Sequence, residues 1–134
     1  MAEAVEPKYE GYWRASYDEE SELPWPTPEK NWAGRAAFLH SLDRVEVDAK
    51  RVAYRGFSIC RVCRCSNGNE DLRLSEWVWP AGYRHYVVDH DVRPSTDFEA
   101  FILGMSRKKF ERIVIILLLI FGLCSLAVAL AKNI

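Results

Sequence analysis

The chain has 134 residues, 28% of them charged, and a formal net charge of −1. This length allows one domain with short extensions, and the nearly neutral balance of charge excludes binding of polyanions through bulk charge alone. Three of the four cysteines are clustered. In a reducing compartment such a cluster indicates a metal site before disulfides.

The first predicted segment, 1–31, is an acidic arm rich in proline, tryptophan and tyrosine. It carries eight acidic and three basic side chains. Proline alternates with other residues over 23–28, which favours extended backbone of the polyproline type. Disordered, solvated tails are usually poor in aromatic residues. We therefore expect this arm to bury its rings along its own domain or along a partner.

The second predicted segment, 32–103, is a compact α+β module. We expect a small zinc-knuckle-like fold of helix, β-hairpin and short helix. The apolar stripe of one helical face predicts a helix over 33–53, and its members are Phe38, Leu42, Val45, Ala49 and Val52. The predicted hairpin consists of a strand that starts at Tyr54 and runs into the cysteines, a turn at 66–69 and a strand over 72–79.

Two further helices are predicted in the C-terminal half of this module. Pro80 suits the first turn of a helix, so a short helix is expected over 80–90. Thr96 and Glu99 have the spacing of a capping box, so another helix is expected to begin there and to continue towards the C-terminus.

Cysteines and histidines within 32–103 have the spacing of a metal site. Cys60 and Cys63 form a C-x2-C pair, and His85 and His90 form an H-x4-H pair. Two thiolates and two imidazoles make up the tetrahedral shell that zinc prefers. On a regular helix positions 85 and 90 point about 140° apart, so the helix must loosen near His90. Cys65 is an alternative ligand that could replace one histidine.

Structural zinc is therefore the predicted cofactor. A module of this size has only a marginal apolar core, and a bound metal supplies the missing stability. The alternatives are buried cysteines with unrelated surface histidines, and redox or iron–sulfur chemistry. A thiol nucleophile of Cys60 or Cys63 with His85 is a further alternative. Cysteines at metal spacing are more often ligands, and no nucleotide-binding fingerprint occurs, so we predict no catalytic residues and no enzyme activity.

The stretch from Ser58 to Phe98 resembles a family of small, uncharacterised Cys/His proteins. The shared motifs are C-R-x-C, N-G, W-x-W-P-x-G, H-Y-x-x-x-H and R-P-x-x-x-F, and they cover about a third of the chain. The resemblance implies a compact, zinc-binding Cys/His module without a known activity. It also implies packing and turn residues beside the metal, namely Trp77, Trp79, Pro80 and Gly82.

The C-terminal stretch 113–131 has no charged residue and follows a basic juxtamembrane segment, 104–112. At about 1.5 Å per residue this run is roughly 28 Å long, close to the roughly 30 Å thickness of bilayer hydrocarbon. We expect a single transmembrane helix, a tail-anchored topology and a short tail, 132–134. The basic segment places the N-terminal part on the cytoplasmic or matrix-like side. An organellar inner membrane and a virion internal membrane are both compatible.

These features favour a non-catalytic, tail-anchored accessory or assembly subunit of a larger membrane-associated complex. A respiratory-type complex and a linker between a virion shell and its membrane both fit. The expected partners are the lipid bilayer and a protein assembly, which the arm 1–31 and the zinc module would contact.

The alternative function is a membrane-tethered zinc adaptor that binds nucleic acid or an acidic protein. Arginines surround the predicted site: Arg55, Arg61, Arg64, Arg73, Arg84 and Arg93. They could bind phosphate or an acidic partner, or they could pair with the chain's own carboxylates. The order of the cysteine and histidine pairs is that of a ββα zinc finger, but the distance between the pairs is much longer and no base-reading helix face is evident. Nucleic acid is therefore the less favoured partner.

Overall fold

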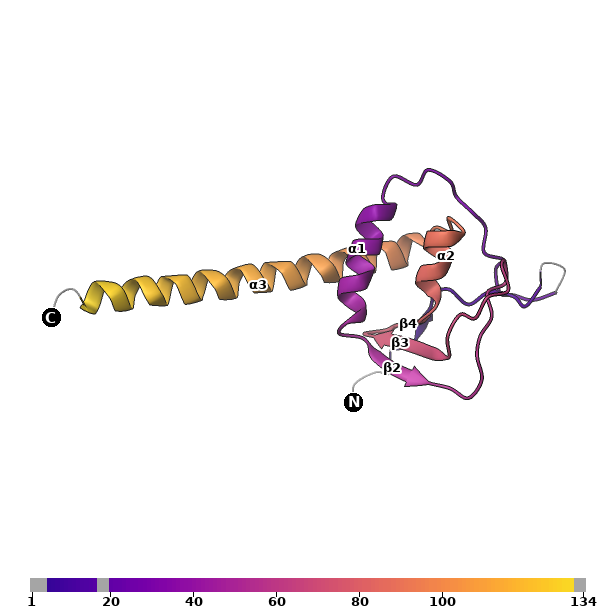
Figure 1. The fold of residues 1–134 in the computed structure, drawn as a ribbon, viewed down its shortest axis with the longest axis horizontal. Coiled ribbons are helices and arrows are strands. Elements are labelled where there is room, and N and C mark those ends of the chain that lie inside the picture. Colours follow the sequence, from indigo (N-terminus) through magenta and orange to yellow (C-terminus); the bar gives the residue numbers. More distant parts are fainter. Residues whose placement is uncertain (1–4, 17–19, 132–134) are drawn as a thin grey trace.

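The computed structural model describes residues 5–16 and 20–131, with the backbone alone described over 122–131. It is a small α+β fold (Figure 1). The elements in chain order are β1 (Lys8–Tyr9), α1 (Arg35–Glu46), β2 (Lys50–Ala53), β3 (Glu70–Leu74), β4 (Trp77–Pro80), α2 (Tyr83–Asp89) and α3 (Thr96–Ala131).

The strands form one mixed, four-stranded sheet in the order β1-β4-β3-β2. β2, β3 and β4 are an antiparallel meander, and Leu72 of β3 lies opposite Trp79 of β4. β1 runs parallel to β4 at the edge of the sheet. The sheet therefore joins the start of the N-terminal arm to the centre of the module.

The apolar core lies between one face of the sheet and all three helices. Alternate residues of a strand point to the same face, so Trp77 and Trp79 both enter this core, where they are buried. Phe98 of α3 lies at its centre, with ring centroids 5.0 Å from Trp77 and 5.4 Å from Trp79. α1 contributes Phe38 to the same cluster. Full burial of one such side chain stabilises a fold by about 1.5–3 kcal/mol.

The predicted helix over 33–53 is shorter in the structure. Phe38, Leu42 and Val45 are buried as the stripe predicts, but α1 ends at Glu46. Residues 50–53 instead pair with β3 as the strand β2. β-branched side chains pack well on a pleated sheet, and Val52 thus belongs to a strand although its spacing continues the helical stripe.

The predicted hairpin also differs from the observed strands. Residues 54–65 are mainly irregular, and the single predicted strand over 72–79 is two strands, β3 and β4. The chain reverses between them at Ser75, which has φ +54°. Glycine and asparagine are the usual residues at positive φ, so a serine gave no turn signal there. The predicted turn at 66–69 is wrong, although Gly68 has φ +85°. Ser66 pairs with Ile59 in an isolated bridge, and the chain turns earlier, at 61–63.

The arm 1–31 packs on its own domain over the residues that the structure describes. The backbone N–H of Lys8 donates to the carbonyl of Glu76 (2.7 Å), at the edge of the sheet. The Trp13 ring contacts the ring of Tyr86, with centroids 5.6 Å apart. An isolated bridge joins residue 28 to residue 92. Of the two expected locations of the arm, the structure shows the first.

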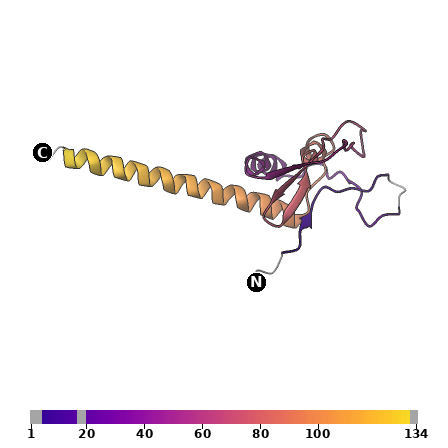
Figure 2. The same ribbon diagram turned by 90° about the horizontal axis from the view of Figure 1, so that it is seen from below.

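The helix α3 leaves the domain as one long, continuous helix (Figures 1 and 2). Its first part belongs to the core, since Phe98 and Ile102 are fully buried. The predicted basic segment 104–112 still contacts the domain, because the Lys109 ammonium lies 2.8 Å from the Asp48 carboxylate. Beyond it, the described apolar side chains end at Phe121, and all of them except Val114 are exposed to solvent.

The membrane predictions must be corrected. In the part of the chain that the structure describes, no helix has the length and apolar character needed to cross a membrane. The described apolar stretch, 113–121, extends roughly 13 Å at about 1.5 Å per residue, under half of the roughly 30 Å of hydrocarbon. This finding overturns the transmembrane helix over 113–131, the tail-anchored single-pass topology and the assigned orientation. The side chains of 122–131 and the predicted tail 132–134 lie outside the described residues.

Candidate metal centre

The first half of the site is a tight turn that presents Cys60 and Cys63. The Cys60 N–H donates to the carbonyl of Cys65 (2.9 Å), and the Arg64 N–H donates to the carbonyl of Cys60 (3.1 Å). Cys60 is fully buried, whereas Cys63 is exposed. A turn of this kind directs two sulfur atoms to the same side, as a C-x2-C pair does for one metal ion.

The second half of the site is α2, which carries His85 in its first turn and ends just before His90. His90 has φ −122° and has left helical geometry, and the next residue, Asp91, has φ +54°. The Val92 N–H then donates to the carbonyl of Tyr86 (3.0 Å) and fixes this end of the helix. Because the helix ends here, the His90 ring is free of the roughly 140° offset of a regular helix. The predicted loosening near His90 is confirmed.

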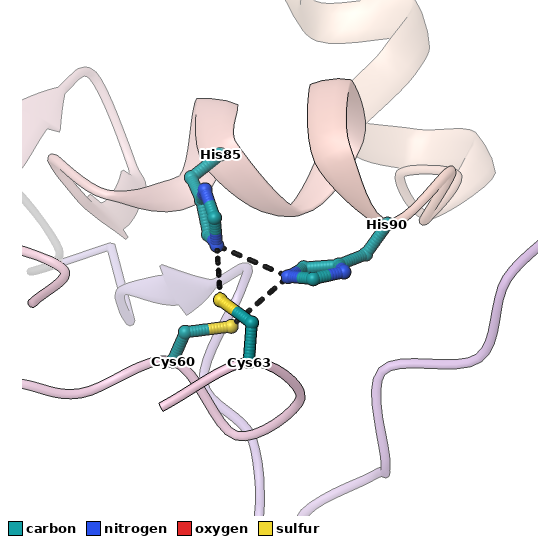
Figure 3. A group of neighbouring side chains, drawn as sticks. All are labelled: Cys60, Cys63, His85 and His90. Atoms are coloured by element: carbon teal, nitrogen blue, oxygen red, sulfur yellow. Dashed lines mark hydrogen bonds between the residues drawn. The ribbon is translucent and has the colours of Figure 1, made fainter. Parts of the chain in front are cut away.

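The two halves meet with all four predicted ligands close together (Figure 3). Cys60 Sγ lies 3.3 Å from His90 Nε2, and Cys63 Sγ lies 3.2 Å from His85 Nε2. The two Nε2 atoms are 3.1 Å apart, and all four donor atoms lie within 4.8 Å of one another. In a tetrahedral zinc shell neighbouring donors are roughly 3.3–3.8 Å apart. The four residues thus lie close enough to hold one metal ion.

Asp89 orients one of the histidines. Its carboxylate lies 2.6 Å from Nδ1 of His85, one helical turn away. A proton on Nδ1 leaves the lone pair on Nε2, the atom that faces the two cysteines. Carboxylate–imidazole pairs of this kind are common behind zinc-bound histidines, where they fix the ring and raise its basicity. Sequence spacing did not identify Asp89, although its i,i+4 relation to His85 is visible in the sequence.

Two further residues fix parts of the site in place, and neither was predicted from the sequence. The backbone N–H of Arg61 donates to the Tyr86 hydroxyl (2.9 Å), which ties the cysteine turn to α2. The Arg35 guanidinium donates to the carbonyl of Val88 and lies 2.8 Å from the Asp91 carboxylate. A cation at the C-terminus of a helix is favourable because it meets the unpaired carbonyls there. Both contacts depend on tertiary structure and leave no local pattern.

Two of the four predicted ligands have pKa values shifted towards the form that binds a metal. The backbone N–H of Cys65, followed by the Cys65 thiol, lowers the pKa of the Cys63 thiol below its usual range. Burial, followed by the proximity of His85, lowers the pKa of His90. A thiolate and a neutral imidazole are the forms that coordinate a metal.

Cys65 lies beside the four-residue group without belonging to it. Its Sγ is 3.2 Å from Cys63 Sγ and 3.4 Å from His85 Nε2. The hydrogen bond between this thiol and Cys63 raises the pKa of Cys65 to about 11. The group close enough to share one ion consists of Cys60, Cys63, His85 and His90, so Cys65 is a spare thiol in this arrangement.

Two of the arginines near the site pair with the chain's own carboxylates. Arg84 lies 2.8 Å from Asp43, and Arg93 lies 2.8 Å from Glu29 of the arm. Arg93 also bonds to Glu99 at the start of α3. These pairs satisfy two of the arginines that the adaptor hypothesis assigned to an external ligand.

Comparisons of the chain with models of protein families, with curated proteins and with solved structures found no match. The resemblance to an uncharacterised Cys/His family therefore stays a prediction. The functional conclusion depends on the geometry of the site.

Proposed function

We propose that this chain is a non-catalytic zinc-stabilised module that works as an accessory or assembly subunit of a larger protein complex. A structural role of the metal is supported by four protein donor atoms, two sulfur and two nitrogen, that lie close together. Four protein ligands complete a tetrahedral shell and leave no position for a substrate or a reactive water. A catalytic zinc site keeps such a position open.

The place of the metal in the fold supports a structural role. The cysteine turn belongs to the irregular segment 54–65, and α2 belongs to the core through Tyr83 and Val87. An ion bound by both would join this irregular segment to the core. Structural zinc sites contribute about 10–16 kcal/mol of apparent binding free energy in small zinc-finger peptides. Such a contribution is as large as the whole net stability of a typical small domain.

Exposed apolar residues beside the metal support a docking role. Phe57 is 74% exposed, Tyr54 is 48% exposed and Val62 is 44% exposed. All three belong to the segment that leads into or forms the cysteine turn. Protein interfaces are enriched in aromatic residues at their buried centres. We assign the contact with the larger assembly to this surface, residues 54–62.

Cobalt substitution tests the closed shell. Co²⁺ in place of zinc should give the intense visible absorption of a tetrahedral site with two sulfur ligands. Addition of azide, which binds cobalt at an open coordination position, should leave the spectrum unchanged. A shift of the absorption bands with azide would show an open position and would contradict the non-catalytic assignment.

Isolation from the native source tests the accessory role. The tagged full chain should purify as a member of one complex with fixed stoichiometry, and Phe57→Asp should abolish that association while zinc content stays the same. Val47→Asp is the matched control, because Val47 is 78% exposed and lies at the end of α1. Purification of the wild-type chain alone under gentle conditions would contradict the subunit proposal.

The alternative adaptor function makes a different prediction. Binding to nucleic acid would weaken steeply with salt, because neutralised phosphates release counterions. Arg55, Arg61 and Arg64 form no ion pair with the carboxylates that the structure describes, so Arg55→Gln with Arg64→Gln should weaken such binding. Salt-sensitive binding that these changes weaken would favour the adaptor over the subunit.

A further inference from the structure

Two exposed thiols lie in contact at the edge of the metal site. The Sγ atoms of Cys63 and Cys65 are 3.2 Å apart, and both side chains are exposed. Cys60, by contrast, is fully buried. Arg64, the residue between the pair, has φ +65°, a backbone conformation that non-glycine residues rarely adopt. The turn thus holds two accessible sulfur atoms side by side.

The two thiols differ in their relation to the predicted metal site. Cys63 belongs to the four-donor group, whereas Cys65 lies outside it. An ion held by Cys60, Cys63, His85 and His90 leaves the Cys65 thiol without a coordination bond. A free thiol next to a metal-bound sulfur can form a disulfide with it, and the metal then loses that sulfur as a ligand.

We propose that Cys63 and Cys65 form an oxidative modification site, where hydrogen peroxide joins them in a disulfide and releases the metal. The Cys63 sulfur attacks one peroxide oxygen, the O–O bond breaks and a sulfenic acid forms at Cys63, with one water released after proton transfer. The Cys65 sulfur then attacks the Cys63 sulfur, and the sulfenic oxygen leaves as a second water. Overall, two thiols and one peroxide give one disulfide and two waters.

The modification would be reversible and would act on the fold. Exposed or strained disulfides have less negative reduction potentials than structural ones and are the labile, regulatory class. Loss of Cys63 as a ligand leaves three donors for the ion and opens the shell. Because the proposed zinc joins the cysteine turn to α2, its release would free the surface 54–62. This second consequence rests on the proposed function, whereas the disulfide itself does not.

The test treats the zinc-loaded full chain with one equivalent of hydrogen peroxide and measures two quantities. A chromogenic chelator reports zinc release, and mass spectrometry of tryptic peptides reports the disulfide. Trypsin cuts after Arg61 and Arg64, so Cys63 and Cys65 fall in separate peptides that stay together only if a disulfide joins them. We expect this linked pair to appear together with zinc release, and thiol reductant with added zinc to reverse both.

Cys65→Ser separates this proposal from general oxidation. The variant should bind zinc with the same stoichiometry as the wild type and should release it about tenfold or more slowly under peroxide. The fourth cysteine of the chain, Cys124, lies far from the cluster in the sequence. Cys124→Ser is therefore the control and should behave as the wild type. Equal release rates for Cys65→Ser and the wild type, loss of zinc from Cys65→Ser before oxidation, or a disulfide that involves Cys60 would each overturn the proposal.

Failure of the metal proposal gives a different result. A chain that binds no zinc can still be oxidised, and the linked peptides can still be measured in it. Formation of the Cys63–Cys65 disulfide without any zinc would support the modification site and refute the zinc. Bound zinc without this disulfide under peroxide would support the zinc and refute the modification site.

Discussion

At the scale of single residues, the site depends on side chains that hold the ligands as much as on the ligands. Asp89 fixes the His85 ring through a 2.6 Å contact with Nδ1. The Tyr86 hydroxyl accepts the backbone N–H of Arg61 and fixes the cysteine turn against α2. A ligand set identified from spacing alone omits both residues, yet they determine how well the four donors are pre-organised.

Asp89→Asn should weaken zinc binding by about 10–100-fold, because loss of a carboxylate behind a zinc-bound histidine typically has that effect. Competition with a chelator of known affinity measures it. Asp43→Asn is the control, since Asp43 pairs with Arg84 and touches no ligand. An affinity of Asp89→Asn equal to that of the control would show that the carboxylate does not orient His85.

Tyr86→Phe should lower the free energy of unfolding of the zinc-loaded chain by about 1–3 kcal/mol, because the Arg61 N–H would lose its acceptor in a partly buried place. Urea unfolding measures this difference. The four ligands are unchanged in this variant, so the amount of zinc bound per chain should stay the same. Unchanged stability would show that water replaces the hydroxyl without cost.

Glu46 gives a dependence of stability on pH. Burial raises the pKa of its carboxyl group, while the Trp79 Nε1–H, which donates to Oε1 (3.1 Å), acts in the opposite direction. A raised pKa in the folded state means that stability from this group is present below the ordinary glutamate pKa and is lost as pH rises through the folded value. Glu46→Gln keeps an acceptor for Trp79 and should be more stable than the wild type at pH 7, with the difference shrinking towards pH 4. Thermal unfolding at both pH values measures this, and an advantage that is the same at both would contradict the assignment.

At the scale of the elements, the start of α3 shows how a distant residue completes a local motif. Thr96 and Glu99 have capping-box spacing, but the observed cap is Ser95, whose Oγ accepts the N–H of Phe98 (3.3 Å). The Glu10 carboxylate accepts the N–H of Ser95 (3.2 Å) and its hydroxyl (2.6 Å). In a capping box the residue three positions into the helix supplies this carboxylate. Here the N-terminal arm supplies it.

Ser95→Ala should therefore lower the free energy of unfolding by about 1–2 kcal/mol, the usual cost of losing an N-cap. Thr96→Ala is the matched control and should change it by less than about 0.5 kcal/mol, as exposed positions generally do. Urea unfolding of the two variants decides between the caps. A larger effect at Thr96 than at Ser95 would restore the local capping box.

The elements that the sequence predicts correctly are those with a local cause. α2 lies within the predicted range 80–90, and α3 begins at the expected place. Local spacing was misleading where tertiary contacts decided the structure. Val52 continues a helical stripe but pairs in a sheet with β3, and Ser75 turns the chain without a glycine. Sequence spacing alone cannot show which partner a segment will meet.

In the site, too, the local sequence patterns were predictable and the tertiary contacts were not. The pairs Cys60–Cys63 and His85–His90 have spacing with a direct chemical meaning, and the structure brings these residues together. The helix end at His90 follows from the geometry of five-residue spacing. The contacts of Tyr86 and Arg35 join segments far apart in the chain, so no local pattern could indicate them. The choice of Cys65 as a spare thiol also depends on distances in space.

At the scale of the whole molecule, the fold is a small domain enclosed by its own arm. The arm adds β1 to the sheet, packs Trp13 on Tyr86 and holds Ser95, the N-cap of α3, through Glu10. The metal site lies between the cysteine turn and α2 (Figure 3). We infer that the irregular segment 54–65 depends on this site for its position.

The most direct test is the zinc content of the purified full chain together with its thermal unfolding before and after a strong chelator. We expect one zinc per chain, and a large fall in unfolding temperature when the chelator removes it. Cys60→Ser should bind less than one zinc and should unfold at the temperature of the chelated wild type. A chain that contains no zinc and unfolds at the same temperature with and without chelator would contradict the proposal of a structural zinc site.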